Sequence, residues 1–582
     1  MLRDQWISVF DAISIHDYTI AIDDTIVVSV WGDRGSYWLH SLEPNGQLKP
    51  ICPSVSTYQI SPVACGSRIA FVAQAPEYNN FYRVHVYDFG DEKVVDLPVS
   101  PLPESRIRSL LWEDENHILT VDTDIAKSAS LVRVHVGEED PEQIAMLPGG
   151  EHWVDPHPAI RADGAILFVI GSAQGRQLML LDPLKETAEL LLRGNKSAEP
   201  LSACWSPCGE RVLALVRRTR KLEAVLLDLS NGKMVVLKLP SLQGLPVWHP
   251  DGQRLVVTVD EWPMTRIAIH DLENQQLTYL PLPEGIMANN VQWHNDRCYF
   301  TAYSGNYPTS LWCWQGSNGE VLPVIGSKKV SGVSDPRVLV IPARTGNFDI
   351  PCLMYEPTNG DASSGTVLML HGGPSTSWRI GWSPFVAALV LAGFRVVLVN
   401  TRGSAFTAWP LPTVSPGSFG ESEMHDIGDC IEQLTCWGMI VPGRVAIMGH
   451  SYGAFIAYRA TLCFPQQVAA AILTSGYLRP EDLLWSKDPQ VREFYNYAFR
   501  DGVAQTDDKT VIHAPCPLLM VHGEYDFQIP AQVAVGNMNR LPGEQHQLLL
   551  LSGESHAFRR KDNVLDWTAE AIQFLCKHLP GR

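Results

Sequence analysis

Residues 445–454 read Val-Ala-Ile-Met-Gly-His-Ser-Tyr-Gly-Ala, an apolar run that breaks into the pattern Gly-x-Ser-x-Gly at residues 449–453. This pattern is typical of a sharp turn between a buried strand and a helix, with Ser451 at its tip. Glycines are needed on both sides because the backbone comes so close to itself that a side chain would clash. Ser451 is therefore the candidate nucleophile. Because the chain has 44 glycines, such a pentapeptide can arise by chance, and the surrounding sequence has to support it.

Two later apolar runs end in residues that complete a candidate catalytic triad. Residues 517–521 read as a buried strand followed by Asp526, and residues 547–551 read as a strand followed by His556. The separations 526 − 451 = 75 and 556 − 526 = 30 residues leave room for two βα units and for one. The chain order Ser, Asp, His is that of α/β-hydrolases. Because open α/β sheets bind ligands outside the carboxyl ends of their strands, we expect all three side chains at one crevice.

An upstream loop supplies the expected oxyanion hole. Residues 366–370 read as a buried strand that runs into His-Gly-Gly-Pro at residues 371–374. Loops of this type lend a backbone N–H to the negative charge that develops on a substrate carbonyl oxygen. The predicted pair of donors is the N–H of Gly373 and that of Tyr452, the residue after the nucleophile. We expect His371 to brace this loop by a hydrogen bond, and we expect His450 to pack or orient, because a side chain next to the elbow serine points away from it.

The chemistry follows from ordinary pKa values. A serine hydroxyl is a poor nucleophile at neutral pH, so His556 would take the proton of Ser451 and later return it to the leaving group. Asp526 would fix the tautomer of His556 and stabilise the imidazolium. No step of this scheme needs a metal ion or an organic cofactor, and we predict neither.

At these residues the chain resembles the prolyl oligopeptidase family of serine peptidases, and its acylaminoacyl-peptidase-like branch in particular. The matching segments occur in family order at residues 371–374, 400–404, 444–453, 522–526 and 554–558. Carried over position by position, the resemblance implies the same triad and the same two oxyanion donors. It also implies an α/β-hydrolase domain that acts on amide bonds.

Two departures from the family pattern concern the neighbourhood of the nucleophile. The family usually has a tyrosine at the position of Thr401 and further glycines where residues 405–408 read Ala-Phe-Thr-Ala. This change alters the loop beside the oxyanion hole, and with it the expected pocket for the acyl side of the substrate. Family members also commonly have a second glycine where this chain has Ala454, a small change that we expect to be tolerated.

In the family, the region after the strand that follows the elbow helix helps to form the pocket for the residue whose carbonyl is attacked. The candidate pocket residues in this chain are Trp485, Phe494, Tyr497 and Arg402. The competing interpretation of residues 485–500 is a packed surface helix. For Arg402 the competing interpretation is an ion pair with Asp426 or Glu421, in place of a bond to a substrate carboxylate.

The first half of the chain contains a repeat. Residues 205–215 read Trp-Ser-Pro-Cys-Gly-Glu-Arg-Val-Leu-Ala-Leu, and residues 248–258 read Trp-His-Pro-Asp-Gly-Gln-Arg-Leu-Val-Val-Thr. Similar units begin near residues 21, 63, 112, 160 and 293, which gives steps of 42, 49, 48, 45, 43 and 45 residues. Seven units of this period predict a seven-bladed β-propeller with four short strands per blade. A pair of β-sandwiches would explain the strands but not the period. We expect the repeated tryptophans to pack between blades.

These observations predict two domains, as expected for 582 residues. The boundaries are an N-terminal segment over 1–17, a β-propeller over 18–330 and a doubly wound α/β-hydrolase domain over 335–582. The first segment is interpreted as a helix that packs on the hydrolase domain. Its apolar face would consist of Trp6, Val9, Phe10 and Ile13.

Bulk properties narrow the partners. The net charge of 45 − 63 = −18 argues against nucleic acid or an anionic membrane as the main partner. Residues 1–5 do not begin the basic-then-apolar pattern of a signal peptide, so secretion is not indicated. The apolar stretch 385–400 is interrupted by Arg395, which favours a helix leading into a buried strand over a membrane span. The twelve scattered cysteines are interpreted as free buried thiols of a cytoplasmic protein. Propeller edges and hydrolase faces both leave room for a homo-oligomer.

The sequence is compatible with three functions. The leading hypothesis is a serine hydrolase that cleaves amide bonds of short peptides or N-acylated amino acids, with the propeller restricting substrate size. The second is an esterase, deacylase or acyl transferase for a small metabolite, motivated by the altered loop after Arg402. The third is a propeller interaction protein with an inactive hydrolase domain. The complete triad argues against it, because inactive relatives of enzymes usually lose one catalytic residue.

Overall fold

The computed structural model describes residues 6–579 except for short stretches. These are residues 34–35, 53–54, 56–57, 76–80, 100–109, 125–127, 139, 147–152, 155–157, 173–174, 183–186, 196, 219–220, 317–318, 358–364, 406–408, 410 and 500–511. The chain forms two units. One consists of Ile13–Tyr303 and Thr309–Ser327, and the other of Met1–Ala12, Ser304–Pro308 and Lys328–Arg582.

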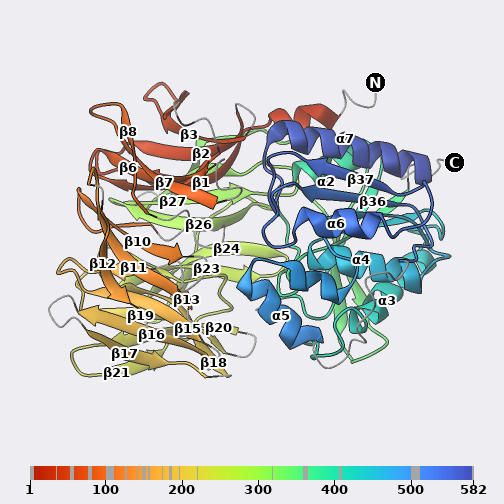
Figure 1. Ribbon diagram of the computed structural model, residues 1–582. Helices are drawn as coiled ribbons and strands as arrows, with labels where there is room; N and C mark the ends of the chain where they lie inside the picture. Colours follow the sequence, from red (N-terminus) through yellow and green to blue (C-terminus); the bar gives the residue numbers. More distant parts are fainter. Residues whose placement is uncertain are drawn as a thin grey trace. The chain divides into compact units, whose positions relative to one another are not determined.

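Seven antiparallel sheets follow one another along the first unit, and the predicted seven-bladed β-propeller is confirmed (Figure 1). Six sheets have four strands; the fourth has five, because β13 and β14 both pair with β15 in place of one longer first strand. The blades consist of β1 (Ser14–Ile20), β2 (Ile26–Asp33), β3 (Ser36–Leu42) and β4 (Leu48–Pro50); β5 (Gln59–Cys65), β6 (Arg68–Ala75), β7 (Phe81–Asp88) and β8 (Lys93–Asp96); β9 (Leu111–Trp112), β10 (His117–Asp124), β11 (Ser128–His135) and β12 (Glu142–Met146); β13 (Trp153–Val154), β14 (Ala159–Ile160), β15 (Ile166–Ser172), β16 (Gly175–Asp182) and β17 (Thr187–Arg193); β18 (Ala198–Trp205), β19 (Arg211–Arg218), β20 (Lys221–Asp228) and β21 (Lys233–Val236); β22 (Val247–Trp248), β23 (Arg254–Glu261), β24 (Met264–Asp271) and β25 (Leu277–Tyr279); and β26 (Met287–His294), β27 (Arg297–Tyr303), β28 (Ser310–Gln315) and β29 (Glu320–Ile325).

The repeated tryptophans lie between neighbouring blades. The indole N–H of Trp112 donates to the carbonyl of Val63 in the preceding blade at 2.8 Å, and that of Trp205 donates to Ala159 at 3.3 Å. The guanidinium of Arg161 lies 4.5 Å from the ring centre of Trp205. The sequence period therefore reflects an inter-blade contact, which Trp112 and Trp205 make near the turn between the first two strands of their blades.

The first and last blades meet through polar contacts. The Tyr18 hydroxyl donates to the carbonyl of Asn290 at 2.7 Å, and the Gln292 amide donates to the carbonyl of Tyr18 at 3.0 Å. His294 and Asp24 approach to 2.7 Å. Because each of these blades takes all its strands from one end of the unit, these side chains join the two ends of the ring.

The second unit contains one eight-stranded sheet, and the predicted α/β-hydrolase fold is confirmed. Its strand order is β30-β31-β33-β32-β34-β35-β36-β37, with parallel pairing from β33 onward and antiparallel pairing before it. The strands are β30 (Arg337–Pro342), β31 (Asp349–Tyr355), β32 (Thr366–Leu370), β33 (Arg395–Val399), β34 (Val445–His450), β35 (Val468–Thr474), β36 (Leu518–Gly523) and β37 (Gln547–Leu551). The helices are η1 (Ser8–Asp11), α2 (Pro384–Leu391), α3 (Ser422–Cys436), α4 (Tyr452–Cys463), η4 (Pro480–Trp485), α5 (Pro489–Phe499), α6 (Ala531–Met538) and α7 (Lys561–His578).

Both faces of this sheet are covered. Every residue of β32 is buried, as expected for a parallel strand between two helical layers. Leu368 and Leu370 belong to the core that packs against α3 and α4, whereas the alternate residues Val367 and Met369 are buried on the other side. In Figure 1, α2 and α7 cover one face of the sheet, and α3 and α4 cover the other. The alternation of side chains along each strand explains why two separate helical layers are needed.

The N-terminal segment differs from the predicted helix over 1–17. Within the described residues, its helical part ends with the short 3-10 helix η1, and the first propeller strand begins at Ser14. Trp6, Val9 and Phe10 are buried, and η1 packs near α2 in the hydrolase unit, whereas Ile13 is 45% exposed. Four apolar positions at helical spacing could not set the length of the helix, because β1 begins at Ser14, directly after the last of them.

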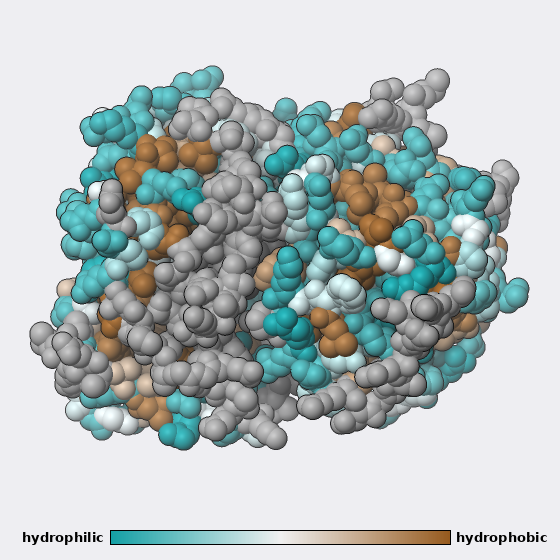
Figure 2. Space-filling model, viewed as in Figure 1, coloured by the Kyte–Doolittle hydropathy of each residue, from teal (hydrophilic) through white to brown (hydrophobic). Residues whose placement is uncertain are grey.

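On the face that Figure 2 shows, hydrophilic side chains cover much of the described surface, with apolar patches between them. Among the described helices, none is long and apolar enough to cross a membrane. All twelve cysteines are free thiols, but Cys208, Cys436, Cys463 and Cys576 are exposed, which corrects the expectation that the thiols are buried.

Candidate active site

Ser451 occupies a strained turn between β34 and α4. Its backbone has φ 54° and ψ −119°, a conformation that residues other than glycine rarely adopt. A Cβ added at Gly449 would lie 2.0 Å from the carbonyl oxygen of Gly453, and one added at Gly453 would lie 2.5 Å from that of Leu370. Both positions therefore require glycine, as the sequence pattern predicted.

The oxyanion loop follows the strand next to the elbow. Leu370 at the end of β32 pairs with Gly449 at the end of β34. The chain leaves these two strands in opposite directions, to β33 and to β35, so a crevice is expected between their carboxyl ends. A Cβ added at Gly372 would lie 3.4 Å from the Cβ of Ser451. The structure thus brings the oxyanion loop and the candidate nucleophile together.

Asp526 and His556 form a short hydrogen bond. Nδ1 of His556 lies 2.7 Å from Oδ2 of Asp526, and Oδ1 of Asp526 accepts the backbone N–H groups of Gln528 and Ile529 at 2.9 Å each. Burial alone would raise the pKa of Asp526, but the neighbouring His556 and hydrogen bonds from His522 and His556 hold it well below its ordinary value. Asp526 is therefore a buried carboxylate whose two oxygens are both engaged.

His450 lies against His556. Their ring centres are 5.0 Å apart, and Nδ1 of His450 lies 3.1 Å from Oγ1 of Thr474. Burial lowers the pKa of His450 to about 3, so its ring is neutral at physiological pH. His450 packs on the predicted base.

The two predicted oxyanion donors lie in the loop after β32 and at the start of α4. Within the described part of the chain, the N–H groups of Gly373 and Tyr452 donate to no backbone carbonyl outside the helices and strands. Nε2 of His371 lies 2.7 Å from the hydroxyl of Ser404, and its Nδ1 lies 3.0 Å from that of Thr376. Burial lowers the pKa of His371. His371 makes the bracing contacts that we expected of it.

Arg402 forms the ion pair that the sequence allowed. Its Nη2 donates to Oδ1 of Asp426 at 2.6 Å, and its backbone N–H donates to Oδ2 at 2.7 Å. Nη2 also donates to the hydroxyl of Thr345 at 2.9 Å. The guanidinium charge is thus compensated within the protein, which corresponds to the alternative of an ion pair with Asp426.

The predicted pocket residues divide into two groups. Phe494 lies beside Tyr452, with ring centres 5.9 Å apart, and beside Phe419 at 5.5 Å. Tyr497 contacts Phe419 at 6.0 Å but is 58% exposed, and Trp485 is 63% exposed. Of these three aromatic residues, Phe494 is the one that contacts Tyr452, a predicted oxyanion donor. Most of the altered loop, residues 406–408, lies outside the described residues.

Glu423 was missed in the sequence analysis. Its Oε1 accepts the hydroxyl of Tyr452, and its Oε2 accepts the backbone N–H of Gly420 at 3.0 Å. Burial raises the pKa of Glu423 to about 7. A signal was present, since Glu423 precedes Ile427 and Cys430 at the spacing of the buried face of α3, where a carboxylate is unexpected.

Ala454, which replaces the second glycine of the family pattern, has a matching gap opposite it. A Cβ added at Gly476 would lie 2.3 Å from the Cβ of Ala454, whereas its next neighbour, the carbonyl oxygen of Ser451, would be at 3.5 Å. Ala454 is fully buried. The methyl group of Ala454 fits because Gly476 has no side chain.

We expect Gly476→Ala to destabilise the protein by about 1–3 kcal/mol, because it overpacks a buried contact behind the elbow. The double variant Gly476→Ala with Ala454→Gly is expected to recover most of that stability, since the clash involves these two methyl groups alone. Urea unfolding of the two single variants and the double variant tests this. Equal destabilisation of the Gly476→Ala and double variants would contradict it.

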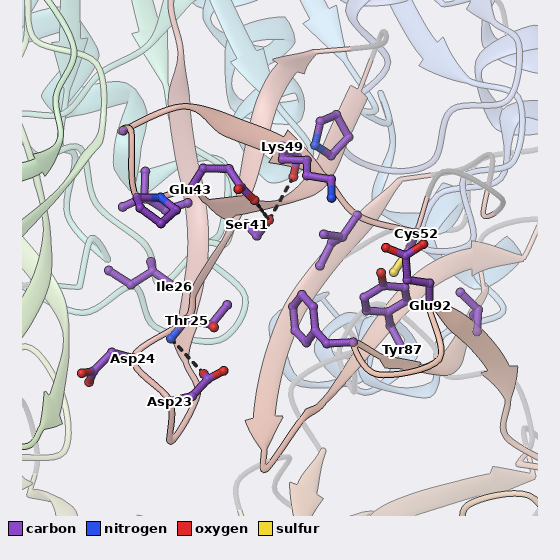
Figure 3. A pocket seen from close by; sticks show the side chains of 17 residues that line it. Asp23, Asp24, Thr25, Ile26, Ser41, Glu43, Lys49, Cys52, Tyr87 and Glu92 are labelled. Carbon is purple, nitrogen blue, oxygen red and sulfur yellow. Dashed lines mark hydrogen bonds between the residues drawn. The ribbon is translucent and has the colours of Figure 1, made fainter.

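A separate groove lies on the propeller unit (Figure 3). It has a volume of about 900 Å³ and is lined by outer strands and turns of the first two blades. Two of its acidic residues have partners: Asp23 accepts the N–H of Thr25 at 3.0 Å, and Glu43 accepts the hydroxyl of Ser41 at 3.4 Å. None of the predicted site residues lines this groove.

The C-terminal part of the chain is similar to known peptidases. Residues 378–582 match the prolyl oligopeptidase family. The acylamino-acid-releasing enzyme of Sus scrofa is 27% identical over 249 residues, which are 40% of this chain and 34% of that protein. The chain thus matches about a third of the length of that relative.

Two solved structures share the fold over almost the whole chain. A puromycin-hydrolyzing peptidase of Mycobacterium tuberculosis superposes with a TM-score of 0.81 at 16% identity, over 99% of this chain and 96% of that one. The acylaminoacyl peptidase of Pyrococcus horikoshii gives a TM-score of 0.72 at 14% identity, over 99% and 97%. With its family match, its fold and its relatives, the chain carries a domain of the prolyl oligopeptidase family in residues 378–582.

Proposed function

We propose that this protein is a serine peptidase that hydrolyses amide bonds of short peptides or N-acylated amino acids through an acyl-enzyme. The observation that carries the proposal is the 2.7 Å hydrogen bond between His556 and the buried Asp526, on loops at the same sheet edge as the strained elbow of Ser451. The family match and the acylamino-acid-releasing enzyme among the relatives support an amide as the scissile bond.

In the proposed mechanism, Oγ of Ser451 attacks the substrate carbonyl carbon while Nε2 of His556 accepts the hydroxyl proton. The carbonyl oxygen becomes an oxyanion that accepts hydrogen bonds from the backbone N–H groups of Gly373 and Tyr452. His556 then donates its proton to the leaving amine as the C–N bond breaks. A water molecule attacks the remaining ester by the same route, His556 again accepting and returning the proton, and the acid leaves with Ser451 restored.

The charges at the site support His556 as the general base and Asp526 as the carboxylate that orients it. Asp526 is held ionised by its hydrogen bonds, so it can stabilise a positive charge on His556 during attack. The neutral His450 beside His556 adds no competing positive charge at physiological pH. Each oxyanion donor is expected to contribute about 3–4 kcal/mol to lowering the barrier.

The test compares initial rates on three matched alanine substrates: a free-amino anilide, an N-acetyl anilide and a nitrophenyl ester. We expect anilide cleavage by the wild-type protein and none above background by Ser451→Ala. Preference for the free or the acetylated amine then distinguishes an aminopeptidase from an acylaminoacyl-peptidase. Cleavage of the ester alone would contradict the peptidase proposal and favour an esterase or deacylase of a small metabolite.

We extend the proposal to substrate size, because a seven-bladed propeller accompanies the hydrolase domain in one chain. The expected result is that short peptides are cleaved while a folded protein containing the same sequence is not. Gel electrophoresis of the folded protein and chromatography of the peptide measure the two reactions. Efficient cleavage of the folded protein would refute the size restriction but leave the peptidase proposal intact.

A further inference from the structure

Helix α3 supplies two buried carboxylates, three residues apart, that reach the two sides of the oxyanion hole. Glu423 accepts the hydroxyl of Tyr452, the residue that carries one proposed donor N–H. Asp426 binds both the guanidinium and the backbone N–H of Arg402. Residues three apart lie on the same helix face, so one helix fixes both contacts.

The second contact leads on to the loop with the other donor. Asp426 holds the loop after β33 at Arg402, and in this loop the hydroxyl of Ser404 lies 2.7 Å from Nε2 of His371. The hydroxyl of Thr376 in turn donates to the carbonyl of Gly372 at 2.6 Å. Because Nδ1 of His371 also lies 3.0 Å from the hydroxyl of Thr376, these hydrogen bonds, together with the short chain segment 402–404, link α3 to Gly372, the residue before Gly373.

The first contact is the more unusual of the two. Asp426 faces a guanidinium, but no cation lies within ion-pair distance of Glu423 among the described residues. Aromatic rings pack against Tyr452, the partner of Glu423: its ring contacts Phe419, Phe455 and Phe494. Burying the carboxyl group of Glu423 costs stability. A phenylalanine at position 452 would fill the same space and would need no buried carboxyl partner.

We propose that Glu423 is a positioning residue for the oxyanion hole. It holds the phenol of Tyr452 and thereby fixes the Tyr452 backbone N–H relative to the substrate carbonyl oxygen. The inference rests on the proposed function and adds to it a residue that touches no substrate. Tyr452 is the first residue of α4, where the orientation of the N–H depends on how the residue is held, and a misplacement of about 1 Å can cost about 10²-fold in rate.

The experiment compares Glu423→Gln, Tyr452→Phe and the double variant on the anilide that the wild type cleaves. We expect each single variant to lower kcat by about tenfold with KM nearly unchanged, because the contact acts on the transition state. The double variant is expected to match the single variants, since both remove one shared contact. Glu421→Gln is the matched control, because Glu421 lies at the start of the same helix with a 72% exposed side chain.

A transition-state analogue separates positioning from a merely structural role. A peptide aldehyde forms a hemiacetal with Ser451, whose oxygen occupies the oxyanion hole. Its inhibition constant is expected to rise by the same factor as kcat/KM falls in Glu423→Gln, and to stay unchanged in Glu421→Gln. Loss of thermal stability with an unchanged inhibition constant would overturn the inference. Tyr452→Phe supplies the same comparison if Glu423→Gln fails to fold.

The outcomes separate this inference from the function on which it rests. If the wild type shows cleavage that depends on Ser451 while Glu423→Gln and Tyr452→Phe behave like Glu421→Gln, the positioning role is overturned and the peptidase stands. If the wild type shows no cleavage that depends on Ser451, both are overturned.

Discussion

Replacing Asp526 by Asn is expected to lower kcat for amide cleavage by about 10⁴-fold while KM changes little. In the native protein, Oδ1 of Asp526 accepts two backbone N–H groups and Oδ2 accepts Nδ1 of His556. An asparagine has a single acceptor oxygen, which would remain with the two backbone donors. Its NH₂ group would then face Nδ1 of His556 and favour the tautomer that carries its proton on Nε2. That tautomer cannot accept the proton of Ser451.

The measurement is kcat on the preferred anilide, with circular dichroism to confirm that the variant is folded. Glu524→Gln is a suitable control, because Glu524 belongs to the same loop but binds the exposed Ser552 hydroxyl at 2.9 Å. We expect this control to keep wild-type activity. A loss of less than about tenfold in Asp526→Asn would show that His556 keeps its orientation without the carboxylate, and it would refute the assigned role.

The fold could be predicted because its signals are local. Gly449 reports a turn in which it comes close to Gly453, four residues on, and the period of Trp205 and Trp248 reports a contact between neighbouring blades that recurs along the chain. The seven blades and the hydrolase sheet are both present. Asp526 and His556 could be predicted as candidates for the same reason, since each follows a strand that could be recognised by itself.

The features that were missed depend on which helix packs against which loop. Glu423 meets Tyr452 over 29 residues, and His450 meets His556 over 106 residues, and no sequence period records either contact. The segment before Ser14 shows a related limit, because its apolar positions fit a helix until the strand begins. The gap at Gly476 that accepts Ala454 could be seen only in three dimensions.

We expect Arg402→Met to destabilise the protein by about 3–5 kcal/mol at pH 7.5, because it leaves the buried carboxylate of Asp426 without its cation. Methionine keeps an apolar stem against the ring of Phe348, over which the guanidinium lies in the native protein at 5.3 Å. The side chain of Asp426 is fully buried, and burial already raises its pKa despite Arg402. Urea unfolding of the wild type and the variant at two pH values measures the effect.

The pH dependence of the loss of stability distinguishes an uncompensated charge on Asp426 from a loss of packing around residue 402. Without Arg402, the pKa of Asp426 in the folded protein rises further above its value in the unfolded chain. Between these two values the folded variant binds a proton that the unfolded chain does not bind, so the variant loses stability as the pH rises. Its deficit relative to the wild type is therefore expected to be smaller at pH 5 than at pH 7.5.

Arg344→Met provides the control, because Arg344 binds another carboxylate of helix α3. Arg344 pairs with Asp429, one turn after Asp426, and donates its backbone N–H to the same carboxylate at 2.8 Å. Its side chain is 64% exposed, so water can replace the guanidinium once it is removed. We therefore expect a much smaller loss of stability than in Arg402→Met, with little change between pH 5 and pH 7.5. Equal and pH-independent losses in the two variants would mean that packing, and not an uncompensated charge, sets the stability of this helix.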